Sequence, residues 1–592
     1  MKKTMTERLP EWHVADFPTG PDDARYKKLR ETIERETAAI VAQKETFRAG
    51  TLTVVELAAL LARWNTVVEA IESLHAWATF RYHRDTDDTA AKSYSERIDR
   101  EVAGWHAAFV FLTSGIQAWN AAYADAALAA PELAPYRWMI TQARLLAPHT
   151  LSDGEERVVA LKRATSHEAW SRLRLELDNR QKPGTMRVDG KDTDIRLNIQ
   201  QLVHHADSAV RLEAHQRMKE SYAPDIAVYA HAYNQVVGDY ETESRDLRSY
   251  GGGQEREATE AGVPPAAVDA MLGVLEKNEE LFRRFYRLKA KLIGLKKQTS
   301  ADIYAPIGGA MPSRSYAAAW EDVEAALGSF DAEYAAMTRR FRDEPWIDVP
   351  VKATKYKGAY CWGAPDHPYL LLNWEPTLRD AFTLAHELGH GVHALHAAGA
   401  PYAVRHTAYV IAETASQLNE DLLLERYRTT LKPEEFRTVL AGKIDDVLNA
   451  LFRQGLIARF EREAHARVRE TGLTAEWLNT TWLRLVTERN GDALETLPFE
   501  QYEWARIPHV FDHPFYVYSY AMSMCVVRAL IAKRGERGER FVPAYRAFLA
   551  AGATRSPQEL LADFGLRLDD PNLYAQTLAS VEALVAELES LA

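Results

Sequence analysis

The sequence contains only two cysteines, Cys361 and Cys525, among its 592 residues. Two thiols cannot build a disulfide framework or a zinc site made of cysteines, and such scarcity is typical of a reducing cytoplasm. Positive charge is also in the minority, since 72 Lys and Arg against 84 Asp and Glu give a net charge of −12. We therefore expect a cytoplasmic protein that binds neither nucleic acid nor an anionic membrane.

Long hydrophobic runs are scarce as well. The first residues include Lys2 and Lys3, but the apolar segment that a secretory signal requires does not follow them. One apolar stretch, 102–124, has no charged residue apart from His106, yet it contains Thr, Ser, Gln and Asn side chains and glycines. We expect this stretch to be buried helix rather than a membrane span.

Helical periodicity dominates the rest of the chain. Hydrophobic residues make up 47% and charged residues 26%, as in ordinary folded proteins, and a chain of this length has ample material for a core. Apolar residues recur at helical spacing in the windows 22–47, 51–80, 208–240, 265–292, 433–470 and 574–591. The pattern predicts a mainly α-helical protein with helical regions at 1–182 and 183–345 and a catalytic region at 346–592, interlocked as one unit.

Strand-like sequence is confined to three short segments. They are 346–351, 357–362 and 369–374, which are rich in β-branched or aromatic residues and bounded by Pro, Gly or Asp. All three lie just before the helical segment that contains His386, so a small β-sheet is expected beside that helix. An exposed edge on 369–374 would pair with an extended peptide.

That helical window contains the sequence HELGH, from His386 to His390, which is the HExxH pattern. Four residues of helix advance about 400°, so the two imidazoles lie about 40° apart on one face, with Cα atoms about 6 Å apart. Two ring nitrogens at that spacing can reach one metal ion at about 2.0–2.1 Å. Glu387 borders the same arc and can hold a water at the metal without being a ligand.

A catalytic zinc ion needs a third protein ligand and an open fourth position. His396 has the spacing of the metzincin pattern HExxHxxGxxH, but His393 occupies the position of the glycine that breaks the helix there. In an unbroken helix His396 lies about 15 Å along the axis from His386, which is out of reach.

The other candidates are acids on the next predicted helix, 409–424. Glu413 follows His386 by 27 residues, which leaves room for a turn near 399–401 and an antiparallel return. Glu420 lies seven residues further on the same face and can support a ligating imidazole through a hydrogen bond.

These motifs also resemble a known family. HELGHxxH followed by ETASQLNE (413–420) is similar to the oligoendopeptidase F branch of the thimet-oligopeptidase-like zinc peptidases. Trp12, the stretch 288–306 and WARIPHVFDHPFYVYSYA (504–521) resemble further parts of that branch, so the likeness extends over most of the chain. It implies a large helical bowl with a deep channel that admits short unfolded peptides.

The resemblance also implies roles for single residues. His386, His390 and Glu413 match the ligands of one zinc ion per chain, and Glu387 matches the general base. The expected activity is hydrolysis of internal peptide bonds in short peptides.

A second group of residues is implied by the C-terminal motif. His509 matches a histidine near the substrate. Tyr516 and Tyr518 match a tyrosine-rich stretch whose hydroxyls face the scissile carbonyl, and Tyr520 is a third candidate. Whether packing or catalysis explains these tyrosines is left open by the sequence.

Two rival functions fit the same motif. A helical carboxypeptidase of the angiotensin-converting type also combines HExxH with a downstream glutamate, but it releases C-terminal residues. A catalytically dead peptide-binding scaffold is the rival from another class, and the complete HELGH sequence argues against it.

Overall fold

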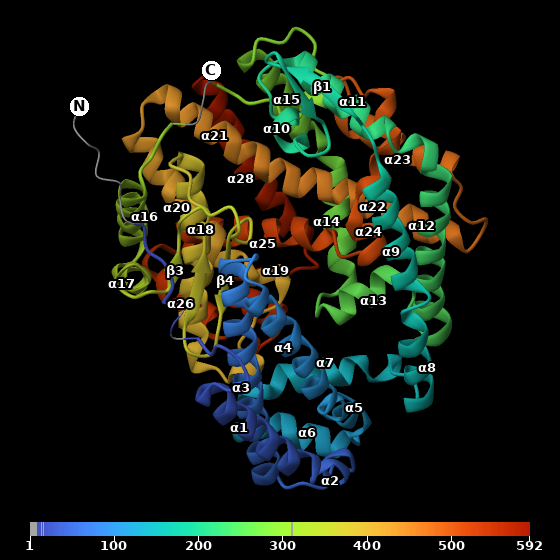
Figure 1. Cartoon of the computed structure of the whole chain (residues 1–592), viewed down its shortest axis with the longest axis vertical. Coiled ribbons are helices and arrows are strands. Elements are labelled where there is room, and N and C mark those ends of the chain that lie inside the picture. Colours follow the sequence, from blue (N-terminus) through green and yellow to red (C-terminus); the bar gives the residue numbers. More distant parts are fainter. Residues whose placement is uncertain (1–8, 14, 16, 309–311) are drawn as a thin grey trace. The chain divides into compact units, whose positions relative to one another are not determined.

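The computed structural model describes residues 9–13, 15, 17–308 and 312–592, and helices dominate it, which confirms the predicted mainly α fold (Figure 1). The chain divides into two units. Unit 1 comprises Met1–Ala147, Met311–Leu431 and Lys533–Gly565, and unit 2 comprises Pro148–Ala310, Lys432–Ala532 and Leu566–Ala592. Each unit combines segments from all three regions expected from the sequence, 1–182, 183–345 and 346–592. The division into these three regions remains a prediction.

Unit 1 is built from helices around one small sheet. Its elements are α1 (Ala24–Val41), α2 (Lys44–Arg48), α3 (Val54–Arg84), α4 (Thr89–Ala107), α5 (Val110–Ala118), α6 (Ala121–Ala129), η2 (Pro131–Tyr136), α7 (Arg137–Leu146), α16 (Tyr316–Phe330), α17 (Ala332–Asp343), β3 (Ile347–Asp348), β4 (Tyr360–Gly363), β5 (Pro368–Leu371), α18 (Leu378–His396), η7 (Ala397–Gly399), η8 (Tyr402–Val404), α19 (Tyr409–Ala412), α20 (Thr414–Thr430), η11 (Gly538–Arg540), α26 (Phe541–Ala550) and α27 (Pro557–Ala562).

Unit 2 is also helical, with one β-hairpin. Its elements are η3 (Ala147–His149), α8 (Asp153–Arg163), α9 (His167–Arg180), β1 (Thr185–Val188), β2 (Lys191–Asp194), α10 (Ile199–Val203), α11 (Ser208–Glu220), η4 (Ala223–Asp225), α12 (Ile226–Glu241), η5 (Thr242–Leu247), α13 (Gly253–Glu260), α14 (Pro265–Lys277), α15 (Glu279–Leu292), η6 (Ser300–Asp302), α21 (Pro433–Leu448), η9 (Asn449–Arg453), α22 (Gln454–Val468), α23 (Ala475–Asn490), η10 (Pro498–Arg506), α24 (Pro508–Asp512), α25 (Tyr518–Arg537) and α28 (Pro571–Ser590). The ends of η3 and α25 cross into unit 1.

The predicted helical windows are helical in the structure, and some of them contain more than one helix. The window 51–80 becomes α3, which begins at a capping box between Thr53 and Glu56. The window 433–470 becomes α21 and α22, joined by the π-helical turn η9. The apolar stretch 102–124 falls on the end of α4, on α5 and on the start of α6. Among the described helices, none is both long and apolar enough to cross a membrane.

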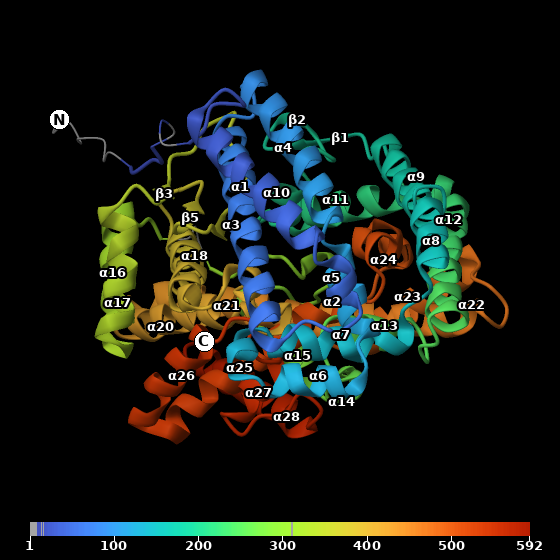
Figure 2. The same cartoon turned by 90° about the horizontal axis from the view of Figure 1, so that it is seen from below.

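The three predicted strands form one sheet beside α18 in unit 1, as expected (Figures 1 and 2). The strand order is β3-β5-β4, with β5 parallel to β3 and antiparallel to β4. Trp12, Phe80 and Tyr369 pack on this sheet with ring centroids 4.7–5.9 Å apart. This aromatic cluster joins the described start of the chain to the sheet and fixes the strands next to α18.

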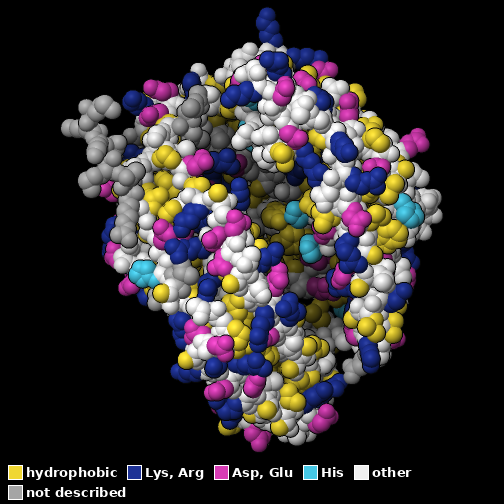
Figure 3. All heavy atoms as spheres, in the orientation of Figure 1, with side chains coloured by type: hydrophobic (Ala, Val, Ile, Leu, Met, Phe, Trp, Pro, Cys, Tyr) yellow, Lys and Arg dark blue, Asp and Glu magenta, His cyan; other side chains and the backbone are white. Residues whose placement is uncertain are grey.

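The surface carries charges of both signs. On the face shown in Figure 3, Lys and Arg side chains are interspersed with Asp and Glu side chains. This mixture agrees with the modest negative net charge of the sequence.

Candidate active site

Helix α18 carries the HExxH sequence and packs directly against α20. The helix is capped by Thr377, whose hydroxyl accepts a hydrogen bond from the Asp380 backbone N–H at 3.2 Å. It then runs unbroken through His386 and His390 to His396. The predicted turn follows at η7, and the chain returns through α19 into α20 (Figures 1 and 2).

The close approach of α18 and α20 depends on Gly389. A Cβ atom at this position would lie 2.4 Å from Ser416 Cα and 2.5 Å from the Ala415 carbonyl oxygen, both in the backbone of α20. One helical turn before, the Asn419 amide donates a hydrogen bond to the Ala385 carbonyl oxygen at 2.9 Å. These contacts fix the register in which acids of α20 meet histidines of α18.

We expect Gly389→Ala to destabilise unit 1 by about 1–3 kcal/mol and to weaken metal binding, because backbone rather than a flexible side chain must move to make room. Thermal unfolding and metal content check this. Gly442→Ala is the matched control, since it is also a helical glycine but has open space around its Cβ position, and it should be neutral or slightly stabilising. Equal stability of the Gly389 variant and wild type would contradict the packing argument.

Three side chains converge at the interface of α18 and α20. His386 Nε2 lies 3.2 Å from His390 Nε2, and each of these nitrogens lies 3.3 Å from Glu413 Oε2. Ligands held at about 2.0–2.1 Å in a tetrahedron are separated by about 3.3 Å, so this triangle has the size that a zinc ion requires. The donor set, two imidazoles and a carboxylate, also fits a catalytic zinc site with an open fourth position.

Glu413 lies at a break in the helix that the sequence predicted over 409–424. The helix is interrupted there, with α19 ending at Ala412 and α20 beginning at Thr414. The Ser416 hydroxyl donates a hydrogen bond to Glu413 Oε2 at 2.6 Å. Burial raises the pKa of Glu413, but hydrogen bonds from the two histidines outweigh burial and lower it, so the carboxylate is anionic.

Glu420 supports His386 from the other side of its ring. His386 Nδ1 lies 2.7 Å from Glu420 Oε1, which directs Nε2 toward the ligand triangle. This contact is the one that the sequence analysis allowed for Glu420. Ser416 was missed, although its position three residues after Glu413 on the same helix face was a usable signal.

His396 is excluded from the metal site. It lies at the end of α18 and packs against Tyr334, with ring centroids 6.1 Å apart. His393 is buried, and burial lowers its pKa to about 3, so it is a neutral core histidine. Both placements agree with the sequence analysis.

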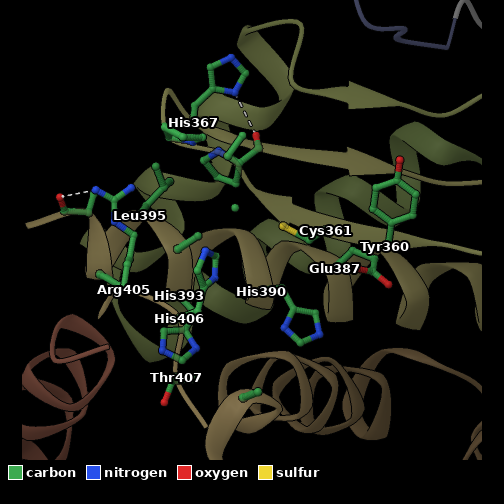
Figure 4. A pocket seen from close by; sticks show the side chains of 18 of the residues that line it. Tyr360, Cys361, His367, Glu387, His390, His393, Leu395, Arg405, His406 and Thr407 are labelled. Atoms are coloured by element: carbon green, nitrogen blue, oxygen red, sulfur yellow. Dashed lines mark hydrogen bonds between the residues drawn. The ribbon is translucent and has the colours of Figure 1, made fainter. Parts of the chain in front are cut away.

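Glu387 follows His386 on α18 and borders the same cavity as Cys361 of β4 (Figure 4). It is 93% buried, and burial raises its pKa, although the two neighbouring histidines partly oppose the shift. A cavity of about 440 Å³ opens beside it, lined by β4, the turn into β5, α18 and the segment 405–407. Figure 4 shows Glu387 and His390 on one side of this cavity, Cys361 on β4 near Glu387, and Arg405 and His406 further along it.

The expectation that 369–374 offers an exposed edge is wrong. β5 is the central strand and pairs with both β3 and β4. The backbone N–H groups of Leu370 and Leu372 donate hydrogen bonds to carbonyls on the β3 side of β5. Cys361 is opposite Leu370 in the antiparallel pair, so its own N–H and C=O point away from β5, to the outer edge of β4. Neither group has a hydrogen-bond partner in the described part of the chain, so β4 rather than β5 presents the edge that borders the cavity.

The residues implied by the C-terminal motif lie in unit 2. His509 is on α24, and its Nε2 lies 3.4 Å from the Tyr520 hydroxyl. The Tyr516 ring is parallel to His509 at 6.3 Å and meets the Tyr520 ring edge-on at 5.4 Å. Tyr518 is only 1% exposed, and its hydroxyl is buried without a hydrogen-bond partner among the described residues. Of the three tyrosines, Tyr516 and Tyr520 are therefore the accessible ones.

The helical fold and the histidine–glutamate triangle on HExxH define a helical metallopeptidase. Comparison with known proteins gives the particular family. The model of peptidase family M3 matches residues 274–580, and that of oligopeptidase F matches residues 116–181. The chain belongs to peptidase family M3 and is a metallo-oligopeptidase that acts on peptides.

Relatives in sequence agree with this assignment. The chain is 27% identical to group B oligopeptidase PepB of Streptococcus agalactiae serotype III (strain NEM316) over 529 residues, which is 88% of each protein. It is 26% identical to oligopeptidase PepF of Bacillus subtilis (strain 168) over 534 residues, covering 89% of this chain and 79% of that protein.

Solved structures show the same fold. A structure from Chlamydophila abortus superposes with a TM-score of 0.87 at 23% identity, covering 99% of this chain and 100% of the other. Oligoendopeptidase-F from Enterococcus faecium superposes with a TM-score of 0.69 at 22% identity, covering 96% and 99%.

Proposed function

We propose that this chain is a zinc-dependent oligoendopeptidase that hydrolyses internal bonds of short, unfolded peptides. The observation that carries the proposal is the triangle of His386 Nε2, His390 Nε2 and Glu413 Oε2, with sides of 3.2–3.3 Å, next to a buried glutamate. When bound there, zinc polarises the scissile carbonyl and lowers the pKa of an attacking water toward about 7.

Glu387 is the proposed general base. Its pKa is raised toward neutral pH. A carboxyl group with such a pKa can both accept a proton from the attacking water and return it to the leaving amine. Burial also keeps bulk water from competing for that proton. His386, His390 and Glu413 hold the ion, and Glu420 fixes the orientation of His386.

His509 and the accessible tyrosines are the proposed donors to the developing oxyanion. The contact between His509 and Tyr520 and the adjacent ring of Tyr516 support a shared role for these three. We omit Tyr518 from this role because its hydroxyl is buried in unit 2. One such donor is typically worth about 3–4 kcal/mol of transition-state stabilisation.

The outer edge of β4 is the proposed binding edge for the substrate backbone. Cys361 turns its N–H and C=O toward the cavity, and an extended peptide can pair with both. Backbone pairing is indifferent to most side chains, so a broad sequence preference follows. The unpaired state of Cys361 and Cys525 supports the expected reducing, cytoplasmic location.

Glu420→Gln should lower metal affinity or kcat by about 10–100-fold, because the amide no longer strengthens His386 as a ligand. Zinc titration with a competing chelator, together with kcat at saturating zinc, measures both effects. Glu425→Gln, on the same helix but ion-paired with Arg534 at the surface, is the control and should behave as wild type. A Glu420 variant with unchanged zinc affinity and kcat would remove the support role.

The decisive experiment is mass spectrometry of a peptide-mixture digest with the zinc-loaded protein. Internal cuts in peptides blocked at both ends are expected, and they should disappear after chelation and return with zinc. Release of C-terminal residues alone would favour the carboxypeptidase rival. Stoichiometric zinc without any cleavage would favour a binding scaffold.

A further inference from the structure

Unit 2 contains a second cavity that takes no part in the proposed peptidase site. It has a volume of about 260 Å³ and lies among α10, α11, η6, η9, α22, α23 and η10. Six formally charged side chains line it, namely Lys219, Arg453, Arg489, Arg506, Glu500 and Glu503. His215 also lines it, and burial lowers its pKa well below the usual value, so it adds no charge. The lining therefore has a surplus of positive charge.

Both carboxylates of the lining are already engaged. Glu500 accepts hydrogen bonds from Lys219 Nζ at 2.6 Å and from the Ser300 hydroxyl at 2.8 Å. Glu503 Oε2 binds Arg506 Nη1 at 2.7 Å, and its Oε1 lies 3.4 Å from Arg453 Nη2. Two carboxylates thus face four cations, and their ion pairs of 4 Å or less involve only three of these cations.

That fourth cation is Arg489, at the end of α23. It is only 6% exposed, and its Nε and Nη2 both donate to the side-chain oxygen of Asn490, at 3.2 and 2.9 Å. Its guanidinium lies 4.7 Å from the ring centre of Phe282. Within the described residues, no carboxylate lies within ion-pairing distance of it. Buried guanidinium groups normally have an anionic partner, so this one lacks the usual compensation.

Three further polar groups of the lining lack partners. Trp482 Nε1, Arg506 Nε and His215 Nε2 are buried and make no hydrogen bond to any described residue. Trp482 and His215 are 3% and 6% exposed, respectively. Buried donors without partners are rare in folded proteins, and several around one charged cavity indicate a missing ligand.

We propose that this cavity binds a small oxyanion of the phosphate class. A doubly charged anion balances the surplus of cations, and guanidinium groups match the spacing of oxyanion oxygens through two parallel N–H donors. The volume is several times the roughly 30 Å³ that one water occupies in the liquid, so a tetrahedral anion has room. Arg489 and the unpartnered indole N–H supply donors that the protein itself leaves unused.

Titration with inorganic phosphate tests the proposal. The full-length, zinc-loaded protein is dialysed into phosphate- and chloride-free buffer at constant ionic strength, and binding is followed by calorimetry and by the thermal midpoint of unfolding. We expect saturable binding in the micromolar to millimolar range and a midpoint that rises with phosphate, because a ligand of the native state stabilises it. Absence of saturable binding, or equal stabilisation by chloride, would overturn the assignment.

Variants locate the binding site. Arg489→Met should weaken phosphate binding at least about tenfold, while its unfolding midpoint without phosphate stays equal to or above wild type, because an uncompensated buried charge is removed. Arg484→Met is the control on the same helix, where Arg484 pairs with Glu463 at the surface, and it should bind phosphate as wild type does. Trp482→Phe keeps the shape, removes the N–H and should weaken binding as well. Wild-type phosphate affinity in both Arg489→Met and Trp482→Phe would place the anion elsewhere, for instance on the metal, and would refute the proposal.

Discussion

Replacing Glu387 by glutamine should lower kcat by about 10²–10⁴-fold and leave close to one zinc ion bound per chain. The amide is nearly the same size as the carboxylate, so the packing of this buried side chain against β4 is retained. It cannot accept the proton of the attacking water, however, and general acid–base catalysis typically contributes a factor of this size. Steady-state hydrolysis of a blocked peptide and metal analysis of the same preparation provide the two measurements.

The control for Glu387 separates chemistry from folding. Glu425→Gln makes the same substitution at the surface of α20 and should retain wild-type kcat. The unfolding midpoint of the Glu387 variant should be at or above wild type, since burial of a carboxylate in the native state is unfavourable. Full turnover by this variant would transfer the role of base to another residue.

Glu413→Gln should remove both metal and activity. Glu413 supplies the one anionic corner of the ligand triangle, and a neutral amide replaces it with a much weaker ligand for a divalent cation. We expect zinc content well below one equivalent after dialysis against a mild chelator, and loss of hydrolysis in proportion. Excess zinc should restore activity only in part.

A histidine variant tests the competing ligand assignment. His396→Ala should retain zinc, because this histidine packs against Tyr334 at the end of α18. Metal content measured in parallel for the two variants decides the question. Retention of zinc by Glu413→Gln together with its loss in His396→Ala would reverse the assignment of the third ligand.

Local rules were sufficient to predict which side chains of the candidate metal site lie together. The spacing of HExxH fixes two imidazoles on one helical face, and the distance to Glu413 allows an antiparallel return that places acid opposite histidine. Glu420 followed from the same argument. These placements could be predicted because each depends on neighbours within one helix pair, where sequence separation translates directly into position.

Long-range features were harder to predict. The edge status of the strand 369–374 depends on which strands flank it, and periodicity carries no information about strand order. The break at Glu413 occurs inside a helical pattern without Pro or Gly, so sequence offered no signal for it. The composition of the two units could not be predicted either, because each unit is made of three segments that are far apart in the sequence.

The interleaved chain has a consequence for biosynthesis. Unit 1 includes Lys533–Gly565, whose helix α26 packs on α18, and within this segment the Ala553 N–H binds the Val404 carbonyl at 2.9 Å. The helix that carries the two histidines therefore lacks part of its packing until the ribosome has translated almost the whole message. The order of synthesis therefore places completion of the packing around this helix near the end of translation.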